Sequence, residues 1–343
     1  MNPDDFTITL DHGGGGLASQ KLVSRLLDLL ENSSSQKENT LEDAATLTVP
    51  GQAGRLVFST DSYVVDPIFF PGGDIGKLAV HGTINDLAMR GAKPLALSLA
   101  MILEEGFPLA DVERIAKSIG KASREAQVPI VTGDTKVVPR GKADKIFITT
   151  AGIGLVDADV DIGAAGAKPG DAVLISGSIG DHGITIMSQR AGITLQGDLR
   201  SDTMPLHRLV ARLVSEFPGA IHVLRDPTRG GVATALNELT TASGVAVELS
   251  EESLPINPAV RSACALFGLE PLWLANEGKC LLFCDADRAE AILAAMRGME
   301  EGRQAAIIGR VLPEAAARVT LRTALGGGRI LRPLHGQPLP RIC

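Results

Sequence analysis

The alternation of apolar and polar positions predicts strands and helices in turn along the first part of the chain. Residues 6–10 (FTITL) have the β-branched alternation of a strand, and residues 17–30 place apolar side chains at helical spacing after a glycine run. A further strand is predicted at 55–60 (RLVFST), and we expect it to end in a turn at Asp61. The chain therefore opens as a mixed α/β protein.

The same pattern continues through the first half. Residues 73–92 follow PGG and read as a helix of small residues, for which Asp74 is placed as the N-cap. Further segments are predicted as strands at 95–103, 128–134 and 145–156 and as a helix at 109–126. After a break at 161–171 (DIGAAGAKPGD), the second half repeats the alternation.

We predict two α/β domains and a tail. The first domain is expected at residues 1–160, the second at 161–330, and an extended, flexible C-terminal tail at 331–343. The tail segment PLHGQPLPR contains three prolines and no hydrophobic periodicity, which favours an extended strap over a packed element.

Composition agrees with a large aliphatic core. Hydrophobic residues make up 45% of the 343 residues and aromatic residues only 3%. The net charge of −7, without a basic run, argues against a nucleic-acid surface. No apolar run approaches membrane-spanning length and the N-terminus lacks an export signal, so we expect a cytoplasmic protein without a membrane partner.

Three of the four cysteines read as small buried hydrophobic residues. Cys280 and Cys284 share one face of a predicted strand, and Cys264 falls in a helical stretch, with no further ligands to complete a metal set. Cys343 follows the proline-rich strap, so we expect its thiol to be accessible. The steps from Gly336 to Cys343 span about 23–25 Å when extended, enough to present the thiol outside and withdraw it into a cleft.

Isolated aspartates stand at strand ends or beside small residues. Magnesium binds through a few carboxylates together with phosphate oxygens, so aspartates that converge from different loops would suit a metal–nucleotide site. Taken singly, each is more often a cap or turn residue. The candidates are Asp43, Asp61, Asp86 and Asp134.

The glycine run DHGGGG at residues 11–16 leaves two interpretations open. It is either a flexible terminal loop or a lid whose amides reach phosphate oxygens. It fits neither the Walker A spacing nor the dinucleotide-binding spacing.

Several longer segments resemble one known family. STDSYVVDPIFFPGGDIGKLAVHGTINDLAMRGAKP, GDTKVVPRGKADKIFITTAGIG, LRDPTRGGVATALNEL, EPLWLANEGK and the closing LPRIC are similar to the signatures of the hydrogenase maturation factor HypE. The resemblance covers nearly the whole chain. It implies two α/β domains of the aminoimidazole ribonucleotide synthase-like superfamily.

The resemblance also implies an activity. In HypE-like proteins the C-terminal cysteine, here Cys343, accepts a carbamoyl group from the carbamoyltransferase HypF. ATP then drives dehydration of the thiocarboxamide to a thiocyanate, whose cyanide goes to the iron of a [NiFe]-hydrogenase on the HypC–HypD scaffold complex. Phosphorylation turns the amide oxygen into a leaving group, and loss of the nitrogen's protons completes the C≡N bond. Family members form homodimers through the first domain, so we expect a dimer.

Residue roles follow from the same resemblance. The expected Mg²⁺–ATP ligands are Asp43, Asp61, Asp86 and Asp134, with Thr60 and Asn85 beside them. Lys136 is a candidate to neutralise the transferred phosphate, unless it is only an exposed strand-edge lysine. Glu277 is a candidate base for the carboxamide N–H, unless it is a turn carboxylate.

Four further residues are less easily assigned from the sequence. Asp226 and Arg229 either shape the second domain's side of the cleft or form a structural ion pair. The family often carries cysteine where this chain has His81, which weakens a catalytic or metal role there. His182 is placed near the active site or, as is more common for a lone histidine at a helix start, serves the structure.

Two other functions remain as alternatives. One is another synthase of the superfamily, such as selenophosphate synthesis or ribonucleotide cyclisation. The first of these normally uses a reactive residue near the N-terminus, whereas this chain has no cysteine before Cys264. The other is an adaptor that presents a C-terminal thiol and binds nucleotide only as a conformational signal.

Overall fold

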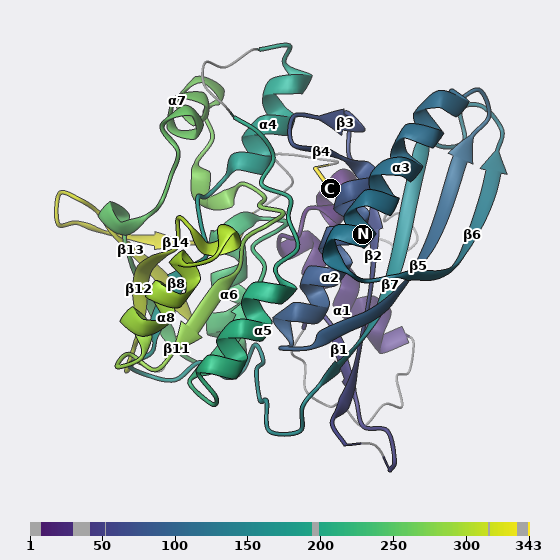
Figure 1. The fold of residues 1–343 in the computed structure, drawn as a ribbon. Helices are drawn as coiled ribbons and strands as arrows, with labels where there is room; N and C mark the ends of the chain where they lie inside the picture. The colour runs from purple at the N-terminus through teal and green to yellow at the C-terminus, as the bar shows by residue number, and fades with distance from the viewer. Residues whose placement is uncertain (1–7, 30–41, 52, 194–198, 315, 335–341) are drawn as a thin grey trace.

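The computed structural model describes residues 8–29, 42–51, 53–193, 199–314, 316–334 and 342–343. Two α/β units lie side by side, each built around one large sheet (Figure 1). The predicted fold class is confirmed. Most of the predicted tail, and residues 6–7 of the predicted first strand, lie outside the described residues.

The first unit contains a five-stranded sheet of order β1-β2-β7-β5-β6. The β5–β6 pair is parallel and the other pairs are antiparallel. The strands are β1 (Ala45–Leu47), β2 (Arg55–Tyr63), β5 (Lys93–Glu104), β6 (Ile130–Val138) and β7 (Ile146–Val156). A short hairpin formed by β3 (Phe69–Phe70) and β4 (Gly73–Asp74) leads directly into a helix that begins at Ile75.

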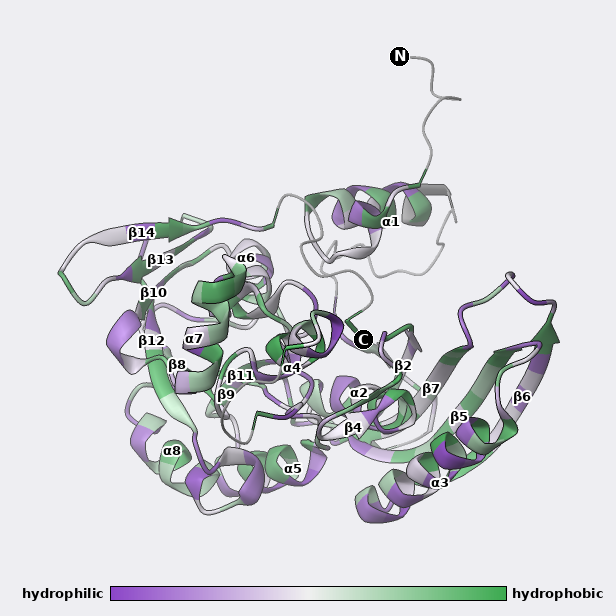
Figure 2. Ribbon diagram, turned by 90° about the horizontal axis from the view of Figure 1, so that it is seen from above, coloured by the Kyte–Doolittle hydropathy of each residue, from purple (hydrophilic) through white to green (hydrophobic). Residues whose placement is uncertain are grey.

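Two helices cover one face of this sheet (Figure 2), namely α2 (Ile75–Met89) and α3 (Leu109–Ala126). Asp74 caps α2 as predicted, since its carboxylate accepts a hydrogen bond of 3.0 Å from the Lys77 amide. All residues of α2 except Lys77 and Asp86 are buried, because the helix packs between the two units.

The second unit contains a seven-stranded sheet of order β14-β13-β10-β12-β8-β11-β9. Continuous apolar stretches such as AVLI and LLFC form its central strands because helices bury both of their faces. The strands are β8 (Ala172–Ile175), β9 (Ile221–Arg225), β10 (Ala246–Ser250), β11 (Leu281–Cys284), β12 (Ala306–Leu312), β13 (Arg318–Arg322) and β14 (Gly328–Leu331).

Helices pack on both faces of this second sheet. Side chains of α6 (Gly231–Ser243) join one hydrophobic cluster, and those of α5 (His207–Glu216) and α8 (Ala289–Arg297) join the cluster on the other face. Two more helices, α4 (Asp181–Arg190) and α7 (Pro258–Phe267), contribute instead to the core of the first unit. The hydrophobic core therefore runs across the junction between the units.

The N-terminal segment differs from its prediction. Leu10 begins a short 3-10 helix, η2 (Leu10–Gly13), instead of ending a strand, and α1 (Leu17–Leu29) follows as predicted. The remaining short 3-10 helices are η3 (Glu251–Ser253), η4 (Pro271–Trp273) and η5 (Glu300–Gly302). None of the described helices is long and apolar enough to cross a membrane.

Three predicted boundaries are also corrected. β2 does not turn at Asp61 but continues to Tyr63, and β6 continues beyond Asp134 to Val138, because both strands pair along their full length with neighbours in the sheet. Leu331, which the sequence assigned to the tail, is buried in β14.

Candidate active site

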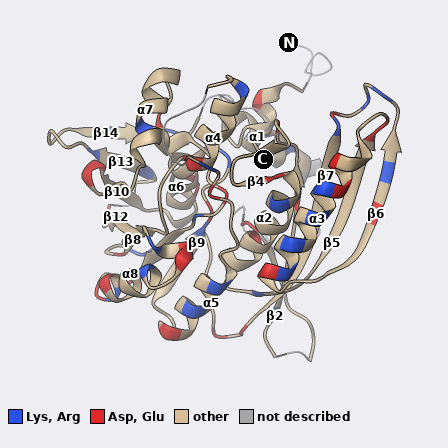
Figure 3. Cartoon of the chain, turned by 45° about the horizontal axis from the view of Figure 1, so that its top comes forward, with Lys and Arg blue, Asp and Glu red and all other residues tan. Residues whose placement is uncertain are grey.

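A small cavity of about 220 Å³ opens between the two units. Acidic residues from both units gather there, beside the end of the chain (Figure 3). The residues that line it are Glu42, Asp43, Thr60, Asp61, Gly82, Asp86, Arg225, Asp226, Thr228, Arg229, Glu277 and Cys343.

Three predicted ligands meet in this cavity from separate elements. Asp43 precedes β1, Asp61 lies in β2, and Asp86 lies in α2. The Ser59 hydroxyl, on the same strand face as Asp61, donates a hydrogen bond of 2.6 Å to Asp86. Arg225 donates to the Asp43 carboxylate across the junction of the units. The convergence that the sequence predicted for these three aspartates is present.

Their electrostatics suit a cation. Burial raises the pKa of Asp43 to about 6, although Arg225 acts against the shift. Burial, followed by repulsion from Asp226 and Asp61, raises the pKa of Asp86 well above its ordinary value. The pKa of Asp226 is raised well above its ordinary value in the same way, by burial and then by Asp43. Carboxylates crowded at low dielectric hold their negative charge best around a divalent cation, so this donor set fits Mg²⁺.

Glu277 enters the cavity from the second unit, on the loop between η4 and β11. The side chain of Asn276 fixes this loop, because it accepts a hydrogen bond of 2.7 Å from the Gly180 amide and donates one of 3.0 Å to the Pro227 carbonyl. A side chain at position 278 would bring its Cβ to 2.0 Å from the Asp202 carbonyl oxygen, so only glycine fits there. The Asn-Glu-Gly sequence thus positions the carboxylate.

The Glu277 carboxyl is almost fully buried and lines the same cavity as the Cys343 thiol. Burial, with repulsion from Asp202 next, raises the pKa of Glu277 well above its usual range. Burial and the nearby Glu277 likewise raise the pKa of the Cys343 thiol far above its ordinary value, while Arg229 acts in the opposite direction. In this conformation the thiol is therefore neutral and weakly nucleophilic.

The end of the chain lies inside the molecule, contrary to the accessible thiol that we expected. Ile342 is buried in the main hydrophobic cluster of the first unit, and Cys343 is only partly exposed. The main-chain carboxyl group of Cys343 accepts a hydrogen bond of 3.1 Å from the Val64 amide, and His182 lies 2.7 Å from the Ile342 carbonyl oxygen. The apolar side chain, the peptide carbonyl and the carboxyl group account for the docking.

Two predicted residues do not reach this cavity within one chain. Asp134 and Lys136 lie on the exposed edge strand β6, where the ammonium is 2.8 Å from the carboxylate. This ion pair lowers the pKa of Asp134. Both side chains point to the sheet face that α2 and α3 leave uncovered, since they pair in register with Ala100 and Ile102.

Thr60 and Asn85 have different positions. Thr60 lines the cavity, and its hydroxyl donates to the Thr150 carbonyl at 3.2 Å. The Asn85 amide instead joins the two units: its nitrogen donates to the Met204 carbonyl at 3.1 Å, and its oxygen accepts from the Leu206 amide at 2.8 Å. Asn85 is not among the residues that line the cavity.

Sequence reasoning missed Arg225, which is the first residue of the RDPTRGG segment and pairs with Asp43. Its signal was weak because a single arginine at a strand end has no distinctive spacing. Asp226 and Arg229, by contrast, line the second unit's side of the cavity as the sequence suggested. Gly15 of the glycine run lies against Arg229, since a Cβ on Gly15 would stand 2.9 Å from the Arg229 Cβ.

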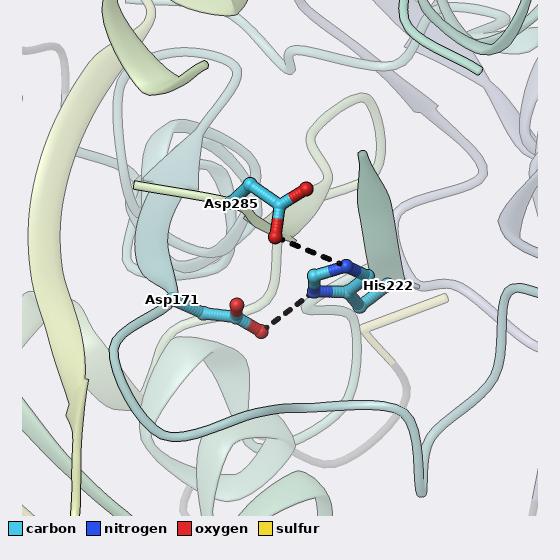
Figure 4. Close-up of side chains that lie close together, drawn as sticks. All are labelled: Asp171, His222 and Asp285. Carbon is cyan, nitrogen blue, oxygen red and sulfur yellow. Dashed lines mark hydrogen bonds and ion pairs between the residues drawn. The ribbon is translucent and has the colours of Figure 1, made fainter. Parts of the chain in front are cut away.

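The other cysteines are buried and free, as predicted. A separate cluster of Asp171, His222 and Asp285 lies in the second unit (Figure 4), where His222 Nδ1 is 2.9 Å from Asp171. Although the three side chains are close enough to ligate a metal, the ammonium of Lys168 stands 2.9 Å from His222 Nε2. This lysine supplies the positive charge, so the cluster reads as a structural ion-pair network.

Comparisons with known proteins agree with this architecture. Residues 41–156 match the family model of the AIR synthase related protein N-terminal domain, and residues 168–322 match that of the C-terminal domain. Carbamoyl dehydratase HypE of Cupriavidus necator is 52% identical over 344 residues, covering 100% of this chain and 97% of the relative.

Solved structures give the same result. A hydrogenase maturation protein HypE in complex with ATP aligns with a TM-score of 0.82 at 51% identity, covering 98% of this chain and 100% of that one. A chain of a HypE–HypF complex aligns with a TM-score of 0.83 at 45% identity, covering 90% and 99% respectively.

Proposed function

From the premise that this chain belongs to the HypE carbamoyl dehydratase family, and is an enzyme of hydrogenase maturation, we propose that it dehydrates a carbamoyl group carried on its own Cys343. The product is a thiocyanate on the same sulfur, which supplies cyanide for hydrogenase iron. One observation carries the proposal: the Cys343 thiol and the buried Glu277 carboxyl lie together in a cavity lined by carboxylates.

ATP supplies the leaving group in this proposal. A HypE relative has been solved with ATP, and we extend that ligand to the carboxylate-lined cavity of this chain. Asp43, Asp61 and Asp86 are the residues that would hold Mg²⁺, which when bound offsets negative charge on the nucleotide phosphates. Arg225 and Arg229 flank the same carboxylates with the two positive charges of the cavity lining.

Glu277 is the candidate base. Dehydration requires two protons to leave the carboxamide nitrogen, and the contact of Glu277 with the thiol places a carboxyl within reach of a group attached to the sulfur. A pKa raised well above the ordinary range gives the ionised form more basicity than a solvated carboxylate has. Asp202 supports this role by raising the pKa and by accepting the Glu277 amide hydrogen bond at 3.1 Å.

A second copy of the chain would account for Asp134 and Lys136. These residues share the uncovered sheet face with apolar side chains, of which Phe58 and Ile102 are 41% exposed and Ile153 is 38% exposed. We propose that a homodimer buries this face. In the dimer, Asp134 and Lys136 approach the nucleotide, where the lysine neutralises the transferred phosphate.

The carbamoyl donor and the cyanide acceptor are partners in the same proposal. A relative has been solved bound to HypF, and we propose that HypF loads the Cys343 sulfur. A neutral, docked thiol is a poor nucleophile, so loading requires the chain end to leave the cavity. The HypC–HypD complex is then the proposed receiver of cyanide.

The decisive experiment follows the mass of the terminal peptide. Protein carbamoylated on Cys343 by HypF is incubated with Mg–ATP and digested, and the mass of the peptide that carries Cys343 is measured. We expect the thiocarboxamide to lose one water, about 18 Da, with one ATP consumed per chain. A loaded peptide of unchanged mass would identify a nucleotide-binding adaptor instead.

Two controls sharpen this test. Cys343→Ala is expected to remain unloaded, so its terminal peptide shows neither mass. Omission of ATP is expected to leave the loaded peptide intact. Loss of water without ATP consumption would contradict phosphate as the leaving group.

A further inference from the structure

We propose that His182 is a positioning residue for the self-modification reaction, which holds the chain end through the carbonyl group of Ile342 and thereby sets the place of the Cys343 sulfur beside Glu277. The inference rests on the proposed function for its catalytic meaning. The docking that it describes is independent of any nucleotide or carbamoyl chemistry.

The contact is short and buried. His182 stands at the start of α4, has no exposed surface, and lies with Nε2 2.7 Å from the Ile342 carbonyl oxygen. A carbonyl oxygen only accepts, so Nε2 must carry the hydrogen. His182 therefore donates a hydrogen bond to the carbonyl group that immediately precedes Cys343.

The rest of the ring is arranged for this tautomer. Nδ1 lies 2.8 Å from the Ser201 hydroxyl, and that hydroxyl already accepts a hydrogen bond from the Thr203 amide at 3.3 Å. The hydroxyl hydrogen is thus available to Nδ1, which leaves the ring hydrogen on Nε2. Phe70 packs edge-on against the imidazole, with 5.6 Å between the ring centroids and an angle of 83°.

The ring also stays neutral. Burial, the largest influence, lowers the pKa of His182, and Arg190 adds to the shift, while Asp202 and the bond to Ile342 act against it. A neutral donor to a peptide carbonyl forms an exchangeable bond that water can replace. The interaction therefore suits a chain end that must dock for one reaction and leave for another.

Because Ile342 directly precedes Cys343, this hydrogen bond affects where the Cys343 sulfur lies. The Ile342 side chain packs in the core, and the Val64 amide donates to the carboxyl group of Cys343, so three contacts hold residues 342–343. His182 provides the polar side chain in that set. Removing its donor is expected to raise the undocked fraction without changing the cavity walls.

Thiol reactivity measures docking directly. The free protein is treated with a maleimide, and modification of Cys343 is followed over time by peptide mass. His182→Phe, which keeps an aromatic ring but has no donor, is expected to react about tenfold faster, the factor expected when one hydrogen bond is lost. His182→Gln, whose amide nitrogen reaches about as far as Nε2, is expected to react at nearly the wild-type rate.

Two serine-to-alanine variants provide a matched comparison. Ser201→Ala removes the partner of Nδ1 and is expected to accelerate modification severalfold. Ser188→Ala removes another buried hydroxyl near the end of α4, which has no hydrogen-bond partner among the described residues, and is expected to leave the rate unchanged. Cys264, Cys280 and Cys284 are buried and report general loosening if they react.

The same variants connect docking to turnover. In carbamoyl-loaded protein, His182→Phe is expected to lower the dehydration rate at saturating ATP by a similar factor, with the KM for ATP unchanged, and glutamine is expected to restore it. Wild-type maleimide rates in both His182→Phe and Ser201→Ala would overturn the proposal, as would equal rates for phenylalanine and glutamine. If the buried cysteines of His182→Phe react with maleimide, the serine variants decide the test. Equal rates of Cys343 modification in Ser201→Ala and Ser188→Ala would then overturn the proposal. Failure of the dehydration assay alone would count against the proposed function, because the maleimide assay contains no nucleotide.

Discussion

Individual carboxyl groups in the cavity differ in the surroundings that set their chemistry. Asp86 accepts a hydrogen bond from Ser59 and lies near other aspartates, whereas Glu277 lies near the Cys343 thiol on a loop fixed by Asn276. The first arrangement favours a cation and the second favours proton transfer. We therefore expect the two acids to fail in different ways when they are neutralised.

Glu277→Gln is predicted to abolish the reaction while sparing the nucleotide. A glutamine at this position cannot accept the proton, so dehydration of loaded protein should slow by about a hundredfold or more. Asp86→Asn is the matched contrast: it should raise the Kd for Mg–ATP by about tenfold and leave carbamoyl loading intact. Nucleotide titration and terminal-peptide mass measure both. Equal nucleotide affinities in the two variants would remove Asp86 from the ligand set.

Among the elements, the five-stranded sheet has an incomplete cover. Helices α2 and α3 cover one face (Figure 2). On the other face, Phe58, Ile102 and Ile153 are exposed. Exposed apolar side chains on an uncovered sheet face favour an interaction site there. Its position beside Thr60 explains why association would bear on the cavity.

Ile153→Asp is predicted to separate the two copies. A carboxylate in the centre of the sheet face would have to be buried unpaired in the dimer, which costs several kcal/mol. Sedimentation velocity should show a dimer for the wild-type chain and a monomer for the variant. Leu266→Asp, at a position on α7 that is 64% exposed, is the control and should remain dimeric. A monomeric wild-type chain would contradict this use of the sheet face.

The sequence predicted elements best where periodicity and end signals agree. The α2 and α3 helices and the central strands of both sheets lie where the apolar pattern placed them, and the capping role of Asp74 is confirmed. Resemblance of the longer motifs to the HypE family is confirmed as well. Strand ends were predicted too early at Asp61, because a polar residue in an edge or half-covered strand disrupts the pattern without ending the pairing.

Long-range placement was harder to predict. The motif that contains Asp134 and Lys136 gives no sign that an edge strand carries it away from the other aspartates within one chain. Docking of Ile342 depends on a pocket built from residues far apart in the sequence, so a proline-rich segment ahead of it read simply as a strap. Arg225 was missed for the same reason, since its partner Asp43 is distant along the chain.

At the scale of the whole molecule, buried ionisable groups link stability to pH in opposite directions. Burial lowers the pKa of His81 from its ordinary 6.5 to about 3, so the unfolded chain binds a proton that the folded chain excludes. His81 does not lower the free energy of unfolding above about pH 6.5, but it lowers that free energy increasingly as the pH falls below 6.5. Carboxyl groups with a raised folded-state pKa, such as Asp226, act in the opposite direction and raise the free energy of unfolding as the pH falls.

His81→Cys should isolate the histidine's share. The wild-type free energy of unfolding should fall relative to that of the variant by up to about 1.4 kcal/mol for each pH unit between 6 and 4. Urea unfolding at several pH values measures the difference, and subtraction cancels the carboxyl contribution common to both proteins. Identical pH dependence in the two proteins would show that His81 is protonated in the folded state.

The central helix α2 has one more consequence. It supplies side chains to three separate hydrophobic clusters, including one that belongs mainly to the second unit. Hinge opening of the two halves would strip these clusters of their shared wall and place a water-averse cylinder in solvent. In the proposed reaction we therefore expect the two units to stay together and the chain end that carries Cys343 to move.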